Sequence, residues 1–231
     1  MGWPNNYAEY TYDSNGNVIG VSGVTGTTWA LKPAAASYIG TAFITDIGRG
    51  TFWTSNGVRW TPLNGRCVLY TKMHSVQSAV ITSATNIIAE EMLLKAGVWQ
   101  TGDILNVTAS FEKLNGITDT IQAILMLSSV QGTVGTVTEA SFPLMIGAGT
   151  TRSSGAHRLR KYSSTVFEAF NSKTADTGLS FAAGGRVSAT MPNLDNAVYL
   201  QLGLSRTAGA GGTEQVVTAE FTVELISNTQ T

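Results

Sequence analysis

Cysteine and histidine are scarce in this sequence, and their scarcity limits the chemistry that it can support. Cys67 is the one cysteine, so no disulfide can form within the chain. A lone cysteine is usually a buried small side chain, and a catalytic thiol would need a base beside it. His74 and His157 are the only histidines, and the sequence places neither near Cys67. Because zinc sites need clustered ligands, we expect no metal and no cofactor.

Charge is also sparse. Charged residues make up 13% of the 231 residues, about half of the share usual in globular proteins, and the formal net charge is −1. Nucleic-acid binding needs a clustered basic surface that neutralises phosphates, so we expect no nucleic-acid partner. A surface with little charge suits a protein that is partly covered by copies of itself.

Long apolar runs are missing as well. No run approaches the roughly 18 residues that a membrane-spanning helix needs. The segment Met1–Pro4 has neither the basic start nor the apolar core of a signal peptide. We therefore expect no insertion into a membrane.

The motifs of common enzymes are absent too. A serine nucleophile in a Gly-x-Ser-x-Gly elbow does not occur, and Gly147-Ala148-Gly149 lacks the lysine and the helix of a phosphate-binding loop. Glu90 and Glu91 are adjacent carboxylates that would point to opposite faces of a strand, which makes them a poor acid–base pair. These absences predict a protein that is not an enzyme.

Hydrophobic alternation is the strongest positive signal, and it is clearest over residues 103–129. Leu105, Val107, Ala109 and Phe111 alternate with polar residues, which is typical of a half-buried strand. Asn115-Gly116 then favours a tight turn. In the second arm, residues 121–127, both faces are apolar, which indicates a central strand covered on both sides. We predict that the two arms form the core hairpin of a β-sandwich.

The remainder of the chain after Cys67 is also strand-like. Residues 67–72, 79–82, 197–205 and 215–226 have short apolar or alternating patterns, and the last is the longest alternator. Residues 86–94 have the composition of a helix, but their length and their neighbours favour a strand. Eight or more strands with long glycine-rich connections predict an all-β chain whose main domain is an antiparallel, TNF-like jelly roll.

The N-terminal segment is rich in aromatic and turn residues. Tyr10 and Tyr12 before Asn15-Gly16, and Val18–Val21 after it, predict a small hairpin. A lone hairpin is marginal in water, so it must lean on another structure. It is either an arm that attaches to a larger assembly or an edge hairpin packed on its own domain. Residues 24–28 resemble a linker.

Residues 39–66 predict a miniature meander of three short strands with aromatic faces, separated by glycine turns. This pattern resembles a small β module of bacteriophage virion proteins, found in tail fibres and other trimeric appendages ahead of a larger β domain. The resemblance implies structural roles as turn residues and as aromatics that pack at the neck between chains. The residues that carry it are Phe43, Asp46, Gly48, Trp53, Asn56, Gly57 and Trp60.

The resemblance implies a homotrimeric structural protein of a tailed-phage virion, bound through its N-terminus to other virion proteins. We expect an attachment arm at 1–37, the β module at 38–66 and the jelly roll at 67–231. Two locations compete: capsid decoration or a head fibre, and a tail fibre. A receptor-binding tail tip that recognises a host surface glycan is an alternative role. A bacterial lectin-like jelly roll is the alternative from another class.

The basic residues gather in one stretch near the middle of the chain. Such a run is usually a solvated face, and the sharper hypothesis is a patch that meets an anionic sugar or an acidic capsid surface. Its members are Arg152, Arg158, Arg160 and Lys161. The five tryptophans could stack on sugars, but core packing is the more common role of such residues.

Overall fold

The chain is built almost entirely of β-strands, which confirms the predicted all-β class. The described part contains one 3₁₀ turn, η1 (Ala35–Ser37), and no helix long and apolar enough to cross a membrane. Two compact units are present: a small unit, Met1–Leu69 with Ser227–Thr231, and a large unit, Tyr70–Ile226. The computed structural model describes residues 10–12, 18–21, 26–73, 79–81, 85–115, 120–141, 152–172, 186–187, 192–208 and 214–228.

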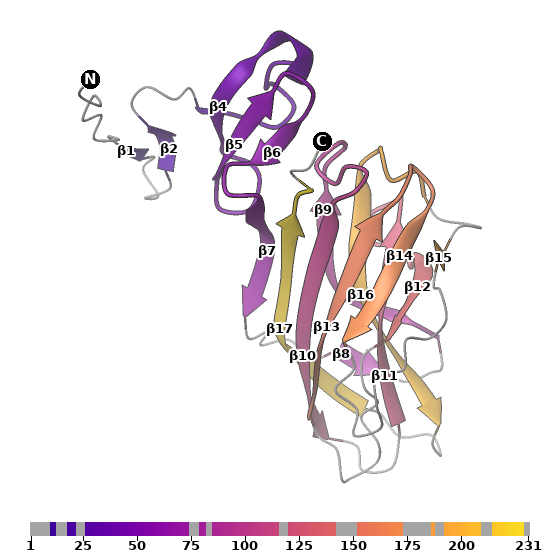
Figure 1. Cartoon of the computed structure of the whole chain (residues 1–231). Coiled ribbons are helices and arrows are strands. Elements are labelled where there is room, and N and C mark those ends of the chain that lie inside the picture. Colours follow the sequence, from indigo (N-terminus) through magenta and orange to yellow (C-terminus); the bar gives the residue numbers. More distant parts are fainter. Residues whose placement is uncertain are drawn as a thin grey trace. The chain divides into compact units, whose positions relative to one another are not determined.

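The small unit contains the predicted meander (Figure 1). Strands β4 (Ile39–Ile44), β5 (Thr51–Asn56) and β6 (Trp60–Pro62) pair in antiparallel order. A fourth strand, β3 (Gly26–Thr27), pairs in parallel with the end of β4. The interpretation of residues 24–28 as a linker is therefore wrong at Gly26–Thr27, which forms sheet hydrogen bonds.

The N-terminal hairpin is present as a separate two-stranded sheet. Strand β1 (Tyr10–Tyr12) pairs antiparallel with β2 (Val18–Val21). The predicted turn at Asn15-Gly16 lies outside the described residues. The pairing itself agrees with the expected hairpin.

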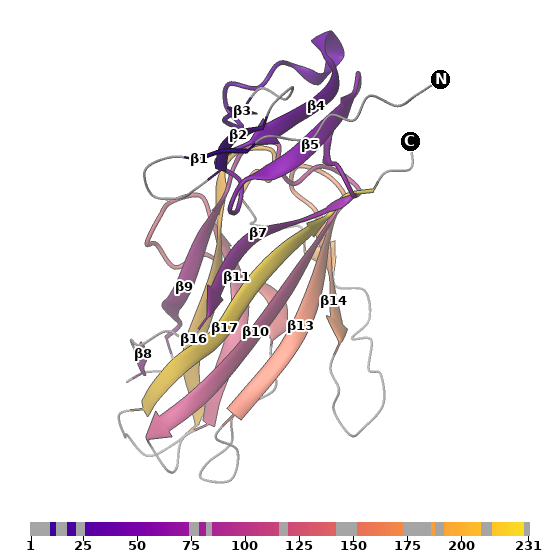
Figure 2. The same ribbon diagram turned by 90° about the vertical axis from the view of Figure 1, so that its left-hand side faces the viewer.

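The large unit consists of two antiparallel sheets, one in front of the other (Figure 2). The seven-stranded sheet has the order β15-β14-β13-β10-β17-β7, with β8 also on β17: β7 (Arg66–Met73), β8 (Ala79–Ile81), β10 (Ile104–Asn115), β13 (Arg152–Lys161), β14 (Phe167–Ser172), β15 (Arg186–Val187) and β17 (Glu214–Ile226). The four-stranded sheet has the order β12-β11-β16-β9: β9 (Ile87–Leu94), β11 (Thr120–Ser128), β12 (Thr136–Ser141) and β16 (Val198–Ala208).

The predicted core hairpin at residues 103–129 is wrong. Its arms are β10 and β11, and they belong to different sheets: β10 pairs with β13 and β17, whereas β11 pairs with β12 and β16. Both are central strands, so each edge of each arm is already occupied by a partner from elsewhere in the chain. The connection between them crosses from one sheet to the other, as in Greek-key sandwiches.

The apolar faces predicted for these strands are buried. Leu105 and Val107 of β10 are fully buried, and they pair with Leu225 and Val223 of β17. Strand β11 is buried on both faces, as predicted, because Met126 on its second face is also inaccessible. At about 25 cal/mol per Å² of apolar surface removed from water, this packing is the main stabilising contribution to the large unit.

One side of the sandwich has an ion pair between an edge strand of each sheet. Lys72 Nζ of β7 donates to Glu90 Oε2 of β9 at 2.8 Å, and the Glu90 side chain is only 4% exposed. This hydrogen bond raises the pKa of Lys72 above 10.5. Burial, and then the charge of Glu90, raise the pKa of Tyr70 above 10.0. Both groups therefore stabilise the fold below pH 10 and lose that contribution as the pH rises through their folded values.

We predict that the stability difference between the wild type and Glu90→Gln shrinks above pH 10. Below that pH the ion pair contributes roughly 1 kcal/mol or less, since Lys72 is 45% exposed. Above it the ammonium deprotonates, and the Glu90 charge opposes ionisation of Tyr70. Urea unfolding between pH 8 and 12 measures the difference. Glu91→Gln is the control, because Glu91 accepts from Gly132 and Gln201; a parallel decline in both variants would contradict the assignment.

Gly48 holds a turn of the small unit in a conformation that only glycine can adopt there. Its φ angle is +59°, and a Cβ atom at this position would lie 2.2 Å from the backbone oxygen of Val68. Gly57 also has a positive φ, +87°, but an added Cβ would make only ordinary contacts, at 3.6 Å or more, with Ile39. Alanine substitutions at the two positions therefore separate two costs. Both would pay for the positive φ angle, but only the substitution at Gly48 would also bring a Cβ atom against the Val68 backbone.

We predict that Gly48→Ala destabilises the small unit by about 3 kcal/mol or more, because backbone overlap adds to the cost of the left-handed conformation. Gly57→Ala should cost only about 1 kcal/mol, the conformational part alone. Thermal unfolding monitored by tryptophan fluorescence measures both. Equal losses in the two variants would show that contact with Val68 is not what requires glycine at position 48.

Candidate functional site

The aromatic residues of the phage-like motif are packed inside the small unit of a single chain. Trp53 is fully buried and meets Trp29 edge to face at 4.7 Å, and Trp60 stacks on Tyr38 at 5.4 Å. Phe43 is 4% exposed. The expected role of Phe43, Trp53 and Trp60 at a neck between chains is therefore corrected: their rings are already covered by their own chain.

The polar residues of the motif hold turns. Asp46 Oδ1 accepts a hydrogen bond from the Trp29 backbone N–H at 2.7 Å. Asn56 Oδ1 accepts from the backbone N–H groups of Val58 and Arg59 at 2.9 and 3.0 Å, which closes the turn that contains Gly57. These side chains position the loops of the small unit.

The small unit also presents apolar side chains to solvent. Ile39 is 81% exposed, Leu31 78% and Val58 77%, the highest values among large apolar residues in the described part of the chain. A Cβ atom built on Gly57 would lie 3.6 Å from Ile39 Cγ1. The Ile39 side chain therefore lies against the β5–β6 turn, which also contains Val58. Sequence reasoning missed this apolar surface, because single apolar residues next to turns have no distinguishing pattern.

The basic stretch of β13 is divided between the two faces of its sheet. Arg152 and Arg158 are exposed and Arg160 is partly buried on the outer face, whereas Lys161 on the inner face is 1% exposed. Lys161 is therefore not part of an accessible patch, and this prediction is wrong. The physical reason is the strand period of two, which sends adjacent residues such as Arg160 and Lys161 to opposite sides.

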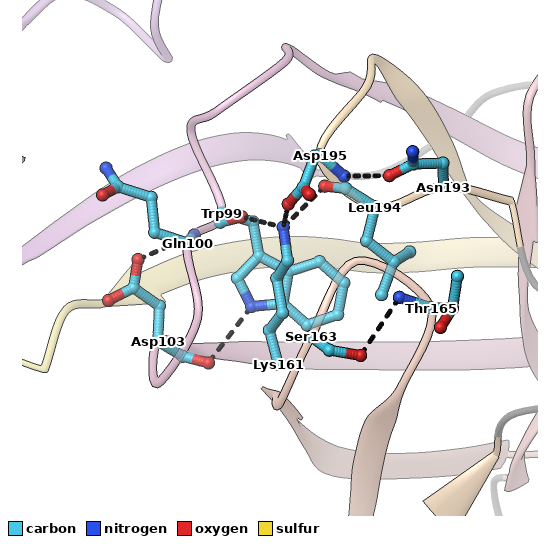
Figure 3. A network of polar contacts seen from close by, with 9 residues as sticks. All are labelled: Trp99, Gln100, Asp103, Lys161, Ser163, Thr165, Asn193, Leu194 and Asp195. Carbon is cyan, nitrogen blue, oxygen red and sulfur yellow. Dashed lines mark hydrogen bonds and ion pairs between the residues drawn. The ribbon is translucent and has the colours of Figure 1, made fainter.

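Lys161 instead forms a buried structural cluster at one end of the sandwich (Figure 3). Its Nζ donates to the backbone oxygens of Trp99 and Leu194, both at 2.8 Å, and to Asp195 Oδ1 at 2.7 Å. Three acceptors match the three N–H donors of an ammonium group. We call these four residues the ammonium cluster.

A compact turn at residues 99–103 completes this end of the fold. Trp99 Nε1 donates to the Asp103 backbone oxygen at 3.1 Å, and Asp103 Oδ2 accepts from the Gln100 N–H at 3.0 Å. The backbone of Lys161 pairs with both Gly102 and Asp103. The cluster thus joins this turn to β13 and to the loop before β16, and its role is structural.

A shallow depression on the outer face of the seven-stranded sheet is the clearest candidate for a binding site. Its volume is about 450 Å³. The outer-facing residues of β10 and β13 supply two serine hydroxyls and an ion pair, in which Arg152 Nη2 lies 3.1 Å from Glu112 Oε1. We call it the outer-face depression; its lining is Ser110, Phe111, Glu112, Arg152, Ser153, Ser154 and Ala219.

Of the basic residues, only Arg152 contributes to the outer-face depression. Arg158 lies further along β13, in a cross-strand row with Asn106 and Glu224. The Arg160 guanidinium is 5.3 Å from the centre of the Tyr162 ring. The four basic residues therefore lie in four different environments. Arg152 lines the outer-face depression, Arg158 lies further along the outer face, Arg160 contacts the Tyr162 ring, and Lys161 is buried in the ammonium cluster.

The described residues contain no group of three or more histidine, cysteine or acidic side chains placed to hold a metal. His157 is 2% exposed on the inner face of β13, and His74 lies outside the described residues. Cys67 is buried and forms no disulfide. Glu90 and Glu91 have different partners, Lys72 for the first and the Gly132 N–H and Gln201 for the second.

Comparisons with known proteins add little to this geometry. No protein-family model and no curated protein matches the chain. Among solved structures, the chain is similar to a carbohydrate esterase of the Shiga toxin-encoding bacteriophage phi24B, at 10% sequence identity and a TM-score of 0.31, over 69% of this chain and 90% of that one. This is a weak likeness to a phage protein.

That comparison contradicts the prediction, made from the missing motifs, that the chain is not an enzyme, and the prediction is withdrawn. The absence of short sequence motifs could not support it, because catalytic residues that are distant in sequence leave no such motif. At this level of similarity the comparison assigns no activity to the chain.

We predict that Lys161→Met destabilises the large unit by about 3 kcal/mol, because buried carbonyl groups lose their donor. Arg158→Met is the matched control: it removes the same charge from the exposed face of the same strand and should cost less than about 0.5 kcal/mol. Urea unfolding measures both variants. A Lys161→Met protein as stable as the control would show that the ammonium cluster does not hold this end of the sandwich.

Proposed function

We propose that this chain is a structural protein of a tailed-phage virion, a homotrimeric β-rich appendage attached through its N-terminal part. The observation that carries the attachment role is the apolar surface of the small unit. Leu31, Ile39 and Val58 are each more than three-quarters exposed, although the same unit buries its aromatic residues well. Ile39 lies against the turn that contains Val58, so these two side chains are neighbours, and adjacent exposed apolar side chains favour contact with another protein.

The strand order supports the proposed jelly roll. Neighbours in the seven-stranded sheet include β7, β17, β10 and β13, and the four-stranded sheet has β9, β16, β11 and β12. The first and last strands of this set, β7 and β17, lie together, and successive strands alternate between the two sheets except β11 and β12, which pair within one sheet; this is the order expected for a double Greek key. The low share of charged residues, 13%, is compatible with close packing between copies.

A second candidate role, recognition of a host surface glycan by the same appendage, is favoured by the outer-face depression. Its volume of about 450 Å³ falls within the range of small-ligand sites, and it carries polar groups of both hydrogen-bonding types. Structural attachment and receptor recognition are compatible, because they use different parts of the chain.

Two measurements test the proposal. Light scattering should give a mass three times that of one chain, and a monomer at micromolar concentration would contradict the trimer. Immunogold electron microscopy of virions should place the protein on heads or on tails, which separates decoration from a tail fibre. Virions without label would contradict the virion assignment.

A double variant tests the attachment surface. We predict that Ile39→Glu with Val58→Glu abolishes incorporation into virions, because two charges replace the exposed apolar contacts, while the folding of the chain is unchanged. Leu114→Glu is the control, since Leu114 is also exposed, at 55%, but lies in the large unit. Circular dichroism confirms folding in each case. Normal incorporation of the double variant would contradict attachment through this surface.

A further inference from the structure

On the outer face of the seven-stranded sheet, the middle of three strands carries a band of mostly small side chains, namely alanine, serine and threonine, with Glu220 as its one charged member. These residues are paired across β13, β10 and β17, so they form rows perpendicular to the strands. Small side chains leave the surface low between larger neighbours. The two rows are Ala156–Thr108–Thr222 and Ser154–Ser110–Glu220.

A β-bulge adds to this low surface. Ser110 pairs with Glu220, but Phe111 pairs with Thr218, so Ala219 is the extra residue of β17. Bulges bend a strand locally and redirect its side chains. The bulged residue here carries only a methyl group, and it lines the outer-face depression together with Ser110 and Ser154.

Charged residues of both signs flank the band. At one end, Arg152 pairs with Glu112, and both side chains are accessible, at 77% and 40%. At the other end, Arg158 shares a row with Asn106, whose Nδ2 donates to Glu224 Oε2 at 3.4 Å. Arg158 lies six positions after Arg152 in β13, a distance of about 20 Å along the strand.

This balance of charge argues against an anionic ligand. A carboxylate or phosphate next to Arg152 would also lie next to Glu112, and Glu220 lies in the adjacent row. The guanidinium supplies donors, the carboxylates supply acceptors, and the serine hydroxyls supply both. The ligand that matches such a surface is uncharged and carries many hydroxyl groups.

We infer that the outer-face depression binds an uncharged oligosaccharide. The Arg152–Glu112 pair presents a donor beside an acceptor, which suits two neighbouring ring hydroxyls, and the hydroxyls of Ser110 and Ser154 contact the same sugar. The inference rests on the proposed receptor-recognition role and names its ligand class. A flat sheet of a second copy would fill this concavity poorly.

An array of defined oligosaccharides that includes neutral, sialylated and sulfated members tests the inference with the full-length chain. At least one neutral member should bind, with confirmation by calorimetry at millimolar sugar. Ser154→Phe should lower the affinity at least about tenfold, because its ring fills the depression from an exposed position. Arg152→Met should weaken binding without altering thermal unfolding, because the pair is exposed.

Two controls make the test decisive. Thr101→Phe places the same ring at an exposed turn outside the depression and should bind normally. Arg158→Ala should also bind normally. Three results would each overturn the inference. They are binding of only the sialylated or sulfated oligosaccharides, binding that is unchanged in Ser154→Phe, and no binding to any member of the array. Absence from virions would reject the proposed function while leaving the array result unaffected.

Discussion

Burial of the inward side chains of β10 and β17 on one sheet, and of β11 and β16 on the other, is the constraint on which the rest of the large unit depends. Leu105, Val107 and Phe221 are inaccessible on the first sheet, and Leu125 and Leu202 on the second. On β10 and β17 apolar burial fixes the register, because a slip by one residue would turn Leu105, Val107 and Phe221 to the outer face. The outward residues, including Ser110 and Ser154, acquire their positions as a consequence.

Polar contacts complete the ends and edges that apolar packing leaves open. The ammonium cluster closes one end by giving three acceptors to a single buried lysine, and Lys72 connects an edge strand of one sheet to Glu90 on the other. Gln201 holds the β11–β12 connection in place, because it donates a hydrogen bond to the Thr133 oxygen and accepts one from the Gly135 N–H. Lys161, Glu90 and Gln201 thus hold loops and edge strands in position through their buried polar contacts.

The period of two predicted which face of β10 is buried and that β11 is covered on both sides. It could not predict strand partners, because the alternation of one strand is compatible with many neighbours, and the Asn-Gly dipeptide at 115–116 suggested a local hairpin where the chain crosses between sheets. The parallel pairing of Gly26–Thr27 with β4 is equally non-local. The same period, applied to β13, already separates Arg160 from Lys161, so the four-residue basic patch could have been rejected from the sequence.

The outer-face depression depends on which strands pair and in which register, and the sequence does not reveal either. Ala219 becomes part of the outer-face depression because the register shifts between Ser110 and Phe111, and no residue type in that segment signals the shift. Arg152 and Glu112 are 40 positions apart and meet only because β10 and β13 pair in this register. A surface that combines residues in this way carries no motif, so its chemistry has to be derived from the balance of donors and acceptors. That balance, with one carboxylate beside the guanidinium and another in the adjacent row, is what favours hydroxyl groups over anions at this site.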